Sequence, residues 1–110
     1  MPREALSLVQ GTVDVLILKA LTWAPMHGYA ISTWIRQRTD GALAVEDAAL
    51  YQALHRLERK EWVESEWGVS DTNRKAKFYK ITRAGRKQLT ADVAELRRYV
   101  AALFKILQPA

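Results

Sequence analysis

The sequence contains no cysteine, only two histidines and no long uncharged hydrophobic run. The lack of cysteine excludes disulfides and thiolate metal sites, and His27 and His55 are too few for a metal site without carboxylates. The longest apolar run, residues 15–23, is interrupted by Lys19 and is far too short to cross a bilayer. Residues 1–4 lack the charged-then-apolar layout of a signal peptide. We therefore expect a cytoplasmic protein without a metal, a cofactor or a membrane partner.

Residue patterns that are typical of enzymes are also missing. The five glycines are scattered singly along the chain, so they form no phosphate-binding loop. Asp92 and Glu95 share one predicted helix face, but this spacing is common on exposed helices. The sequence therefore predicts that the protein is not an enzyme.

The positive charge is concentrated in the last third of the chain. Residues 1–70 carry seven basic and nine acidic side chains, a balance of −2, whereas residues 71–110 carry ten and three, a balance of +7. Seven basic residues and no acidic one lie between Arg74 and Lys87. A local cluster of this kind suits a polyanion. The alternative is a solvated charge run that only aids solubility.

Apolar residues at helical spacing predict three helices in the first half of the chain. The first helix has Thr12 as its N-cap and ends near Trp23, because the sequence Ala24-Pro25 that follows cannot continue a helix. The second spans about residues 27–38, and a short loop follows in which Leu43 and Val45 form a brief strand. The third helix, about residues 47–60, buries a stripe of three leucines: Leu50, Leu54 and Leu57.

The opposite face of the third helix has small residues at its start and hydrogen-bonding residues after them. Such a face can approach a DNA groove closely, or it can pack on a neighbouring helix. Glu46 and Asp47 open the helix, and we expect them to cap it and point away from phosphates. The residues of the face are Ala48, Ala49, Gln52, His55, Arg56 and Arg59.

A β-hairpin follows the third helix. Residues 62–67 and 77–81 alternate between apolar and polar side chains, and turn-forming residues lie between them. Three helices followed by a hairpin with a basic tip is the order of a winged helix-turn-helix, a mostly α fold with a small β-hairpin. The pattern also places three tryptophans in the core (Trp23, Trp34 and Trp62), while Trp67 braces the hairpin.

The last helix is predicted to run from about Arg83 to the end of the chain, with Thr82 as its N-cap. At 1.5 Å per residue, about 25 residues make a helix of roughly 37 Å, which is longer than a core of this size can cover. The simplest partner for this helix is a second copy of itself, related by a two-fold axis. The alternative is that the helix folds back onto its own domain. We therefore divide the chain into a DNA-binding domain (1–82) and a C-terminal dimerisation helix (83–110). The seam has the 4-3-4-3-4 spacing of a coiled coil: Leu89, Val93, Leu96, Val100, Leu103 and Leu107.

Four segments in order resemble the PadR-like repressors, a family named for regulation of phenolic acid decarboxylase. The resemblance covers about residues 8–107 and fits a compact subgroup with a single C-terminal helix. The matching segments are LVQGTVDVLIL (8–18) for the opening helix, MHGYAI (26–31) for the second helix, LYQALHRLE (50–58) for the recognition helix, and WGVS (67–70), RKAKFYKIT (74–82) and AG (84–85) for the wing and the entry to the last helix.

The resemblance implies a homodimeric, ligand-responsive repressor that binds a palindromic operator in double-stranded DNA. It implies that Tyr51 contacts the DNA backbone and that the basic residues of the wing lie along the minor groove. Gln52 stands where the family often has proline, so the contacts to bases differ here. Compact members bind small aromatic or hydrophobic effectors between their long helices, but the middle of this seam is aliphatic, which argues against stacking of a flat ligand there.

From the residues themselves, we expect the third helix to enter the major groove of DNA. Gln52, His55 and Arg56 would then contact base edges or phosphates. The wing residues Arg74, Lys75 and Lys77 would hold phosphates. Two other kinds of protein fit the same pattern: a small-molecule-binding protein, and a helical adaptor that uses its last helix to bind a different protein.

Overall fold

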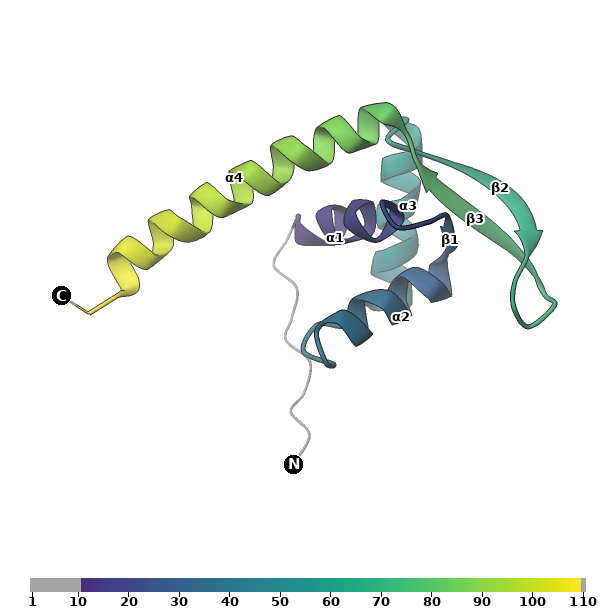
Figure 1. Cartoon of the computed structure of the whole chain (residues 1–110), viewed down its shortest axis with the longest axis horizontal. Coiled ribbons are helices and arrows are strands. Elements are labelled where there is room, and N and C mark those ends of the chain that lie inside the picture. The colour runs from purple at the N-terminus through teal and green to yellow at the C-terminus, as the bar shows by residue number, and fades with distance from the viewer. Residues whose placement is uncertain (1–10, 110) are drawn as a thin grey trace.

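Four helices and a small sheet make up the computed structural model, which describes residues 11–109 (Figure 1). The predicted three helices, hairpin and long last helix are all present, so the winged helix-turn-helix class is confirmed. The first ten residues, which include the start of the resemblance to PadR-like repressors, lie outside the described residues. The elements are α1 (Thr12–Leu21), β1 (Met26–His27), α2 (Gly28–Arg38), α3 (Asp47–Arg59), β2 (Val63–Val69), β3 (Lys75–Ile81) and α4 (Arg83–Leu107).

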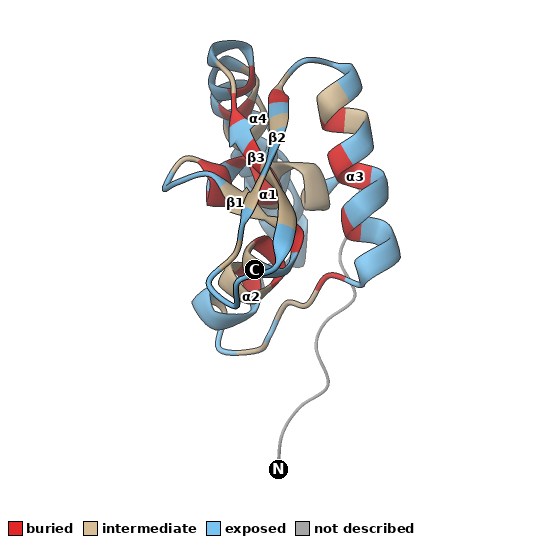
Figure 2. Ribbon diagram, turned by 90° about the vertical axis from the view of Figure 1, so that its right-hand side faces the viewer, coloured by how far each residue is buried: buried red, intermediate tan, exposed pale blue. Residues whose placement is uncertain are grey.

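The core lies where α1, α2 and α3 meet the base of the hairpin. The predicted leucine stripe of α3 is confirmed, because Leu50, Leu54 and Leu57 are each at most 1% exposed. Figure 2 shows α3 with buried residues on its inner side and mostly exposed residues on its outer side. Each buried leucine or isoleucine contributes about 1.5–3 kcal/mol, so this core fixes how α3 is presented. Its other large members are Ile17, Leu18, Ile31, Ile35, Val63 and Ile81.

The sheet has three strands, not the two of the predicted hairpin. β1 joins the free edge of β3, which gives the antiparallel order β1-β3-β2, with Met26 opposite Tyr79. A strand of two residues is too short to show an alternating pattern. His27 ends this strand and caps α2, because its Nδ1 accepts a hydrogen bond from the backbone N–H of Ala30 at 3.2 Å. The wing is thereby attached directly to the start of α2.

Three local predictions are wrong. Thr12 is the first helical residue rather than the N-cap, a position that Gly11 holds with a left-handed φ of 91°. Leu43 forms only an isolated bridge and Val45 none, since the Thr39 hydroxyl accepts the N–H of Leu43 at 3.0 Å. Trp23 is 62% exposed. It follows the end of α1 at Leu21, so helical periodicity no longer determines its direction.

The other two tryptophans placed in the core are partly buried against it. Trp34 and Trp62 both pack on the core cluster. The guanidinium of Arg38 lies between Trp34, at 5.0 Å, and the exposed Trp23, at 4.8 Å from the ring centres. Cation–π contacts therefore cover part of the indole surface that the core leaves open.

The start of α4 packs closely against the wing, whereas its last turns are exposed in the described part of the chain. The Thr82 hydroxyl accepts the N–H of Gly85 at 3.0 Å, which confirms the predicted N-cap. A Cβ on Gly85 would lie 2.1 Å from the backbone oxygen of Trp62, so only glycine fits there. Leu89 is buried and Val93 packs on the core, but Leu103 is 39% exposed.

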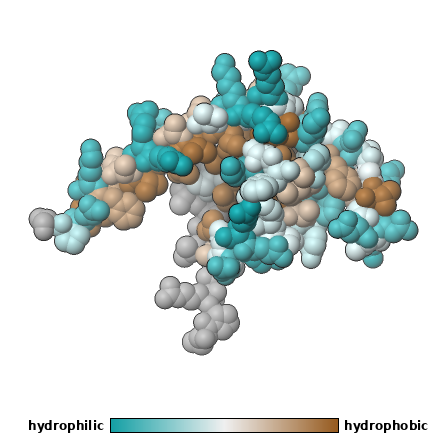
Figure 3. Space-filling model, viewed as in Figure 1, coloured by the Kyte–Doolittle hydropathy of each residue, from teal (hydrophilic) through white to brown (hydrophobic). Residues whose placement is uncertain are grey.

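The rest of α4 extends away from the body as an arm, on the opposite side of the molecule from the wing (Figure 1). Hydrophobic surface continues along this arm (Figure 3). The helix therefore does not fold back onto its own domain. In residues 11–109, no helix combines the length and apolar character that a membrane span requires. The exposed large apolar residues of the arm are Leu96, Tyr99, Val100, Leu103, Phe104, Ile106 and Leu107.

Candidate nucleic-acid interface

The outward face of α3 is open to solvent, as the sequence predicted. Ala48 and Ala49 in its first turn are small and exposed, which permits a close approach by a ligand. Gln52 and His55 follow on the same face and line a shallow hollow of about 410 Å³ with Arg56 and Arg59. Glu46 holds the N-cap position but makes no side-chain capping bond, contrary to the prediction that it caps the helix.

Arg56 is a member of this face that also forms an ion pair within the protein. Its guanidinium pairs with the Asp14 carboxylate of α1 at 2.7 Å, and the arginine side chain is 43% exposed. The pair connects residues 42 positions apart in sequence, which no local pattern reveals. Arg56 therefore fixes the rotation of α3 against α1, and it retains N–H groups that are free to donate elsewhere.

Glu58 joins α3 to both strands of the wing. One of its carboxylate oxygens accepts the Ser65 hydroxyl at 2.5 Å, and the other lies 3.6 Å from the ammonium nitrogen of Lys77. Burial raises the pKa of the neighbouring Tyr79 phenol, with smaller contributions from Glu58 and Tyr51. The contacts of Glu58 with Ser65 and Lys77 connect α3 to the wing.

Tyr51 lies over the start of α2. A Cβ on Gly28 would be 2.7 Å from the Tyr51 hydroxyl oxygen and 2.9 Å from its ring carbon, so the ring packs directly on the glycine backbone. Tyr51 is still 46% exposed. The resemblance assigned this tyrosine to the DNA backbone, and its side chain lines the groove beside the wing.

The tip of the wing is a compact turn organised by Ser70. Its N–H donates to the Arg74 carbonyl at 2.8 Å and its hydroxyl accepts the Arg74 N–H at 3.3 Å. Asn73 adopts the left-handed conformation with φ 61° and donates to the Ser70 carbonyl at 2.9 Å. This turn leaves Arg74 and Lys75 exposed, while Lys77 lies further down the strand beside Glu58.

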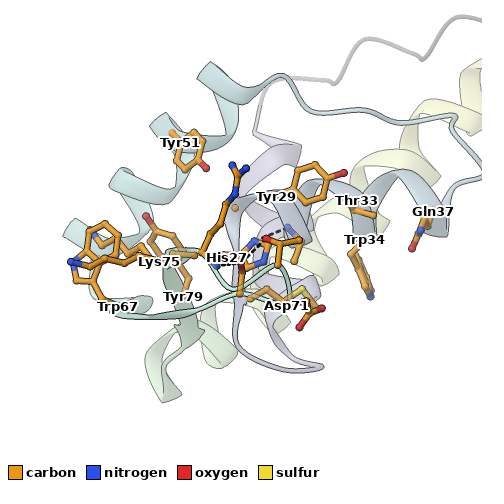
Figure 4. A pocket seen from close by; sticks show the side chains of 18 of the residues that line it. His27, Tyr29, Thr33, Trp34, Gln37, Tyr51, Trp67, Asp71, Lys75 and Tyr79 are labelled. Carbon is orange, nitrogen blue, oxygen red and sulfur yellow. Dashed lines mark hydrogen bonds between the residues drawn. The ribbon is translucent and has the colours of Figure 1, made fainter.

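A broad groove of about 1220 Å³ separates the wing from α2 and α3. Figure 4 shows Tyr51 on one wall, with Trp67 and Lys75 together at one end of the groove and Trp34 at the other. All three basic wing residues that the sequence singled out line this groove, together with Tyr51 and His55 of α3. Gln52 does not, because it faces the open side of the helix. The groove-lining members of the predicted site are Tyr51, His55, Arg74, Lys75 and Lys77.

Sequence reasoning missed the position of Trp67. The pattern assigned it to bracing the hairpin, yet its side chain is 63% exposed and lines the groove. The ammonium nitrogen of Lys75 lies 5.1 Å from the centre of its ring. The strand register could have indicated this position, because pairing of Trp67 with Lys77 sets the indole among the basic residues.

Comparison with known proteins gives the family. The model of the transcriptional regulator PadR-like family matches residues 17–91, more than half of the chain. The chain belongs to this family. It is therefore a transcriptional regulator and not an enzyme, as the sequence predicted, and DNA binding is implied. The matched residues include all of the DNA-contacting residues proposed above and the first turns of α4.

Solved structures of PadR-like relatives share the whole fold. A transcriptional regulator from Clostridium thermocellum is 30% identical with a TM-score of 0.83, covering 90% of this chain and 96% of that one. A PadR family transcription regulator from Clostridium difficile is 25% identical with a TM-score of 0.73, covering 90% and 100%. The long last helix is therefore part of the shared architecture.

Two sequence relatives carry no assigned function. An uncharacterised protein of Lysinibacillus sphaericus is 34% identical over 88 residues, which are 80% of this chain and 81% of that protein. A 37.1 kDa protein in transposon TN4556 of Streptomyces fradiae is 34% identical over 96 residues, which are 87% of this chain but only 26% of that protein.

Proposed function

We propose that this PadR-like regulator is a cytoplasmic repressor that binds a palindromic DNA operator as a homodimer and responds to a small effector. One observation carries the DNA-binding part: the open face of α3 lies beside a groove whose other wall bears the basic residues of the wing. An acidic duplex fits such an arrangement, because the helix enters the major groove and the wing follows the backbone.

The residues of the interface divide between base contacts and phosphate contacts. Gln52 and His55 lie on the exposed face of α3 and are placed to meet base edges. Tyr51 at the groove wall contacts the backbone, as do Arg74 and Lys75 of the wing. Arg56 is paired with Asp14. We therefore assign Arg56 a role in orienting α3, in addition to any phosphate contact.

Lys77 has a divided role in this proposal. Its ammonium group lies 3.6 Å from Glu58, which neutralises part of its charge, and its side chain is 34% exposed. Removal of Lys77 should therefore weaken DNA binding less than removal of Arg74 or Lys75.

The exposed apolar side of the α4 arm supports the homodimer. Leu89 and Val93 are used within the chain's own domain, so the intermolecular seam consists of the later four positions. Two antiparallel copies of this arm would bury each other's apolar residues. The four seam positions are Leu96, Val100, Leu103 and Leu107.

The same arm supports an effector site. Tyr99 is 57% exposed and Phe104 is 52% exposed, and both lie next to the aliphatic seam. Between two arms, these rings would line a site for a small aromatic or hydrophobic molecule. Its binding would change the relative position of the two α3 helices, which a palindromic operator requires to be fixed.

The wing tests the proposal directly. Substitution of Arg74, Lys75 and Lys77 together by alanine should weaken binding to all DNA, because phosphate contacts are independent of sequence. The slope of log K against log salt should flatten by about 0.9 for each phosphate contact that is lost. The measurement is a salt titration of DNA binding by fluorescence anisotropy. A triple variant that keeps the wild-type slope would show that the wing does not contact phosphates.

A further inference from the structure

Trp67 is a large aromatic residue that stays mostly exposed among residues 11–109. It lies in the middle of β2 with its side chain 63% exposed, and Val69, two residues further along, is 65% exposed. Burial of a tryptophan removes about 150–250 Å² from water, so an open ring at this position favours a partner. The ring lines the groove between the wing and α3.

The strand register places two lysines of the wing and its acidic strand residues on opposite faces of the sheet. Trp67 lies directly opposite Lys77, and Val69 directly opposite Lys75. Residues directly opposite each other share a face of the sheet, so this face alternates apolar and basic side chains. Glu64 and Glu66 lie at the alternate positions of β2, whose side chains point to the opposite face of the sheet.

The acidic residues of β2 therefore lie on the face of the sheet opposite to Trp67 and Val69. Glu64 pairs with Lys80 and Glu66 with Phe78, and both glutamates are exposed. Among the strand residues of the wing, the groove side therefore presents lysine and apolar groups but no carboxylate. The one acidic wing residue at the groove, Asp71, belongs to the turn.

Basic and apolar groups in alternation match the sugar–phosphate strand of DNA. Phosphates carry its charge, and the C–H faces of the deoxyriboses are its apolar part. The opposite wall of the groove carries Tyr51 and His55 of the recognition helix, so the strand that separates the major from the minor groove would pass between the two walls.

We propose that the indole of Trp67 packs against a deoxyribose of this strand, while Lys75 holds an adjacent phosphate. The inference rests on the proposed DNA-binding function and adds a residue and a kind of contact to it. Lys75 already lies 5.1 Å from the ring centre, so the cation and the apolar surface are presented together. Trp67 thus positions the wing on the backbone by an uncharged contact.

An uncharged contact has a distinctive salt dependence. Binding of phosphates by lysine releases condensed counterions, and the loss of one such contact lowers the salt slope by about 0.9. Packing of a ring on a sugar releases none. Trp67→Ala should therefore lower DNA affinity about tenfold at every salt concentration and leave the slope unchanged. Lys75→Ala should lower both affinity and slope.

The chain contains a matched control. Trp23 is exposed to the same degree, 62%, and is not among the residues that line the groove. Trp23→Ala should leave both affinity and slope unchanged. Trp67→Phe keeps an aromatic ring and should retain most of the affinity, which separates loss of the contact from damage to the wing; thermal unfolding of each variant checks its fold.

The experiment is a DNA-binding titration of wild type and these four variants over a range of salt concentrations. A tenfold loss for Trp67→Ala with the wild-type slope, restored by Trp67→Phe, supports the inference. An affinity for Trp67→Ala equal to that of Trp23→Ala would overturn it and assign the ring to a partner other than DNA. A slope reduced as in Lys75→Ala would also overturn it. Wild-type protein without salt-dependent DNA binding would contradict the proposed function itself.

A spectroscopic measurement gives a second test. Tryptophan fluorescence should change when wild-type protein binds DNA. Trp34 lines the same groove, so the change should be smaller, rather than absent, in Trp67→Phe, although that variant still binds. An equal change in Trp67→Phe and wild type would show that the indole does not meet DNA.

Discussion

At the scale of single residues, two glycines determine how the DNA-binding surface is assembled. Gly85 lets the start of α4 lie against the Trp62 backbone, and Gly28 lets the Tyr51 ring lie on the start of α2. The two positions differ in what a side chain would meet. At Gly85 it would meet fixed backbone, whereas at Gly28 it would meet the far end of a side chain that can rotate.

This difference predicts a variant that is stable but binds poorly. Gly28→Ala should change the free energy of unfolding by less than about 1 kcal/mol, because alanine favours the helix and Tyr51 can move aside. DNA affinity should fall up to about tenfold, since the displaced tyrosine would lose the proposed contact with the DNA backbone. Chemical denaturation and a DNA titration measure the two effects. Binding as tight as wild type would show that the position of Tyr51 is irrelevant to DNA.

Residue identity alone could predict part of this site. The exposed face of α3 and the basic wing residues followed from helical periodicity and charge. Trp23 and Trp67 did not, because one follows a helix end and the direction of the other depends on strand register. The Arg56–Asp14 and Glu58–Lys77 pairs join separate elements, and no local pattern could indicate them.

At the scale of elements, an ion pair adds to the core packing that orients α3. Asp14 pairs with Arg56 of α3, and α1 packs against both α3 and α4. The arm is therefore connected to α3 through α1, by core packing and by this side-chain pair. The wing is attached to the same helix by Glu58.

Asp14→Asn should impair the discrimination of DNA sequences more than the affinity for DNA. The variant frees the Arg56 guanidinium, so binding to random DNA should be equal or tighter, while the preference for operator over random DNA should fall several-fold as α3 loses its fixed orientation. Stability should change by less than about 1 kcal/mol, as is usual for a partly exposed pair. Paired titrations with operator and random DNA measure the ratio, and an unchanged ratio would contradict the positioning role of the pair.

The elements themselves were predicted well where they are long. The bounds of α2, α3 and α4 agree closely with the periodicity of the sequence, because each has a clear apolar stripe and a defined end. β1 was missed because two residues form no pattern. The predicted strand at Leu43 failed because a hydroxyl of the preceding loop takes the N–H that a ladder would use.

At the scale of the whole molecule, the arm and the wing lie on opposite sides of a small body (Figure 1). The arm carries exposed apolar side chains, and the wing carries exposed basic side chains, among them Arg74 and Lys75. In a monomer the apolar surface of the arm stays in contact with water. In the proposed dimer this surface is buried, and two DNA-binding surfaces are presented at once. The length of α4 predicted this shape, but the point at which the helix leaves its own core required the structure.

Substitution in the arm should separate dimerisation from folding. Leu103→Glu places a charge in the proposed seam and should convert a dimer into a monomer that remains folded, since Leu103 contributes nothing to the buried core. Ala102→Glu adds the same charge at a neighbouring exposed position outside the seam and should remain dimeric. Sedimentation measures the mass of each. A wild type with the mass of one chain would contradict the dimer.

In the proposed dimer, two copies of this chain present their α3 helices to two adjacent major grooves. Selection of bound fragments from a random DNA pool is the decisive test of this arrangement. The selected sequences should contain an inverted repeat whose half-site centres lie about 34 Å, or 10–10.5 base pairs, apart. Failure to enrich any sequence, or enrichment of single half-sites without a repeat, would contradict the account.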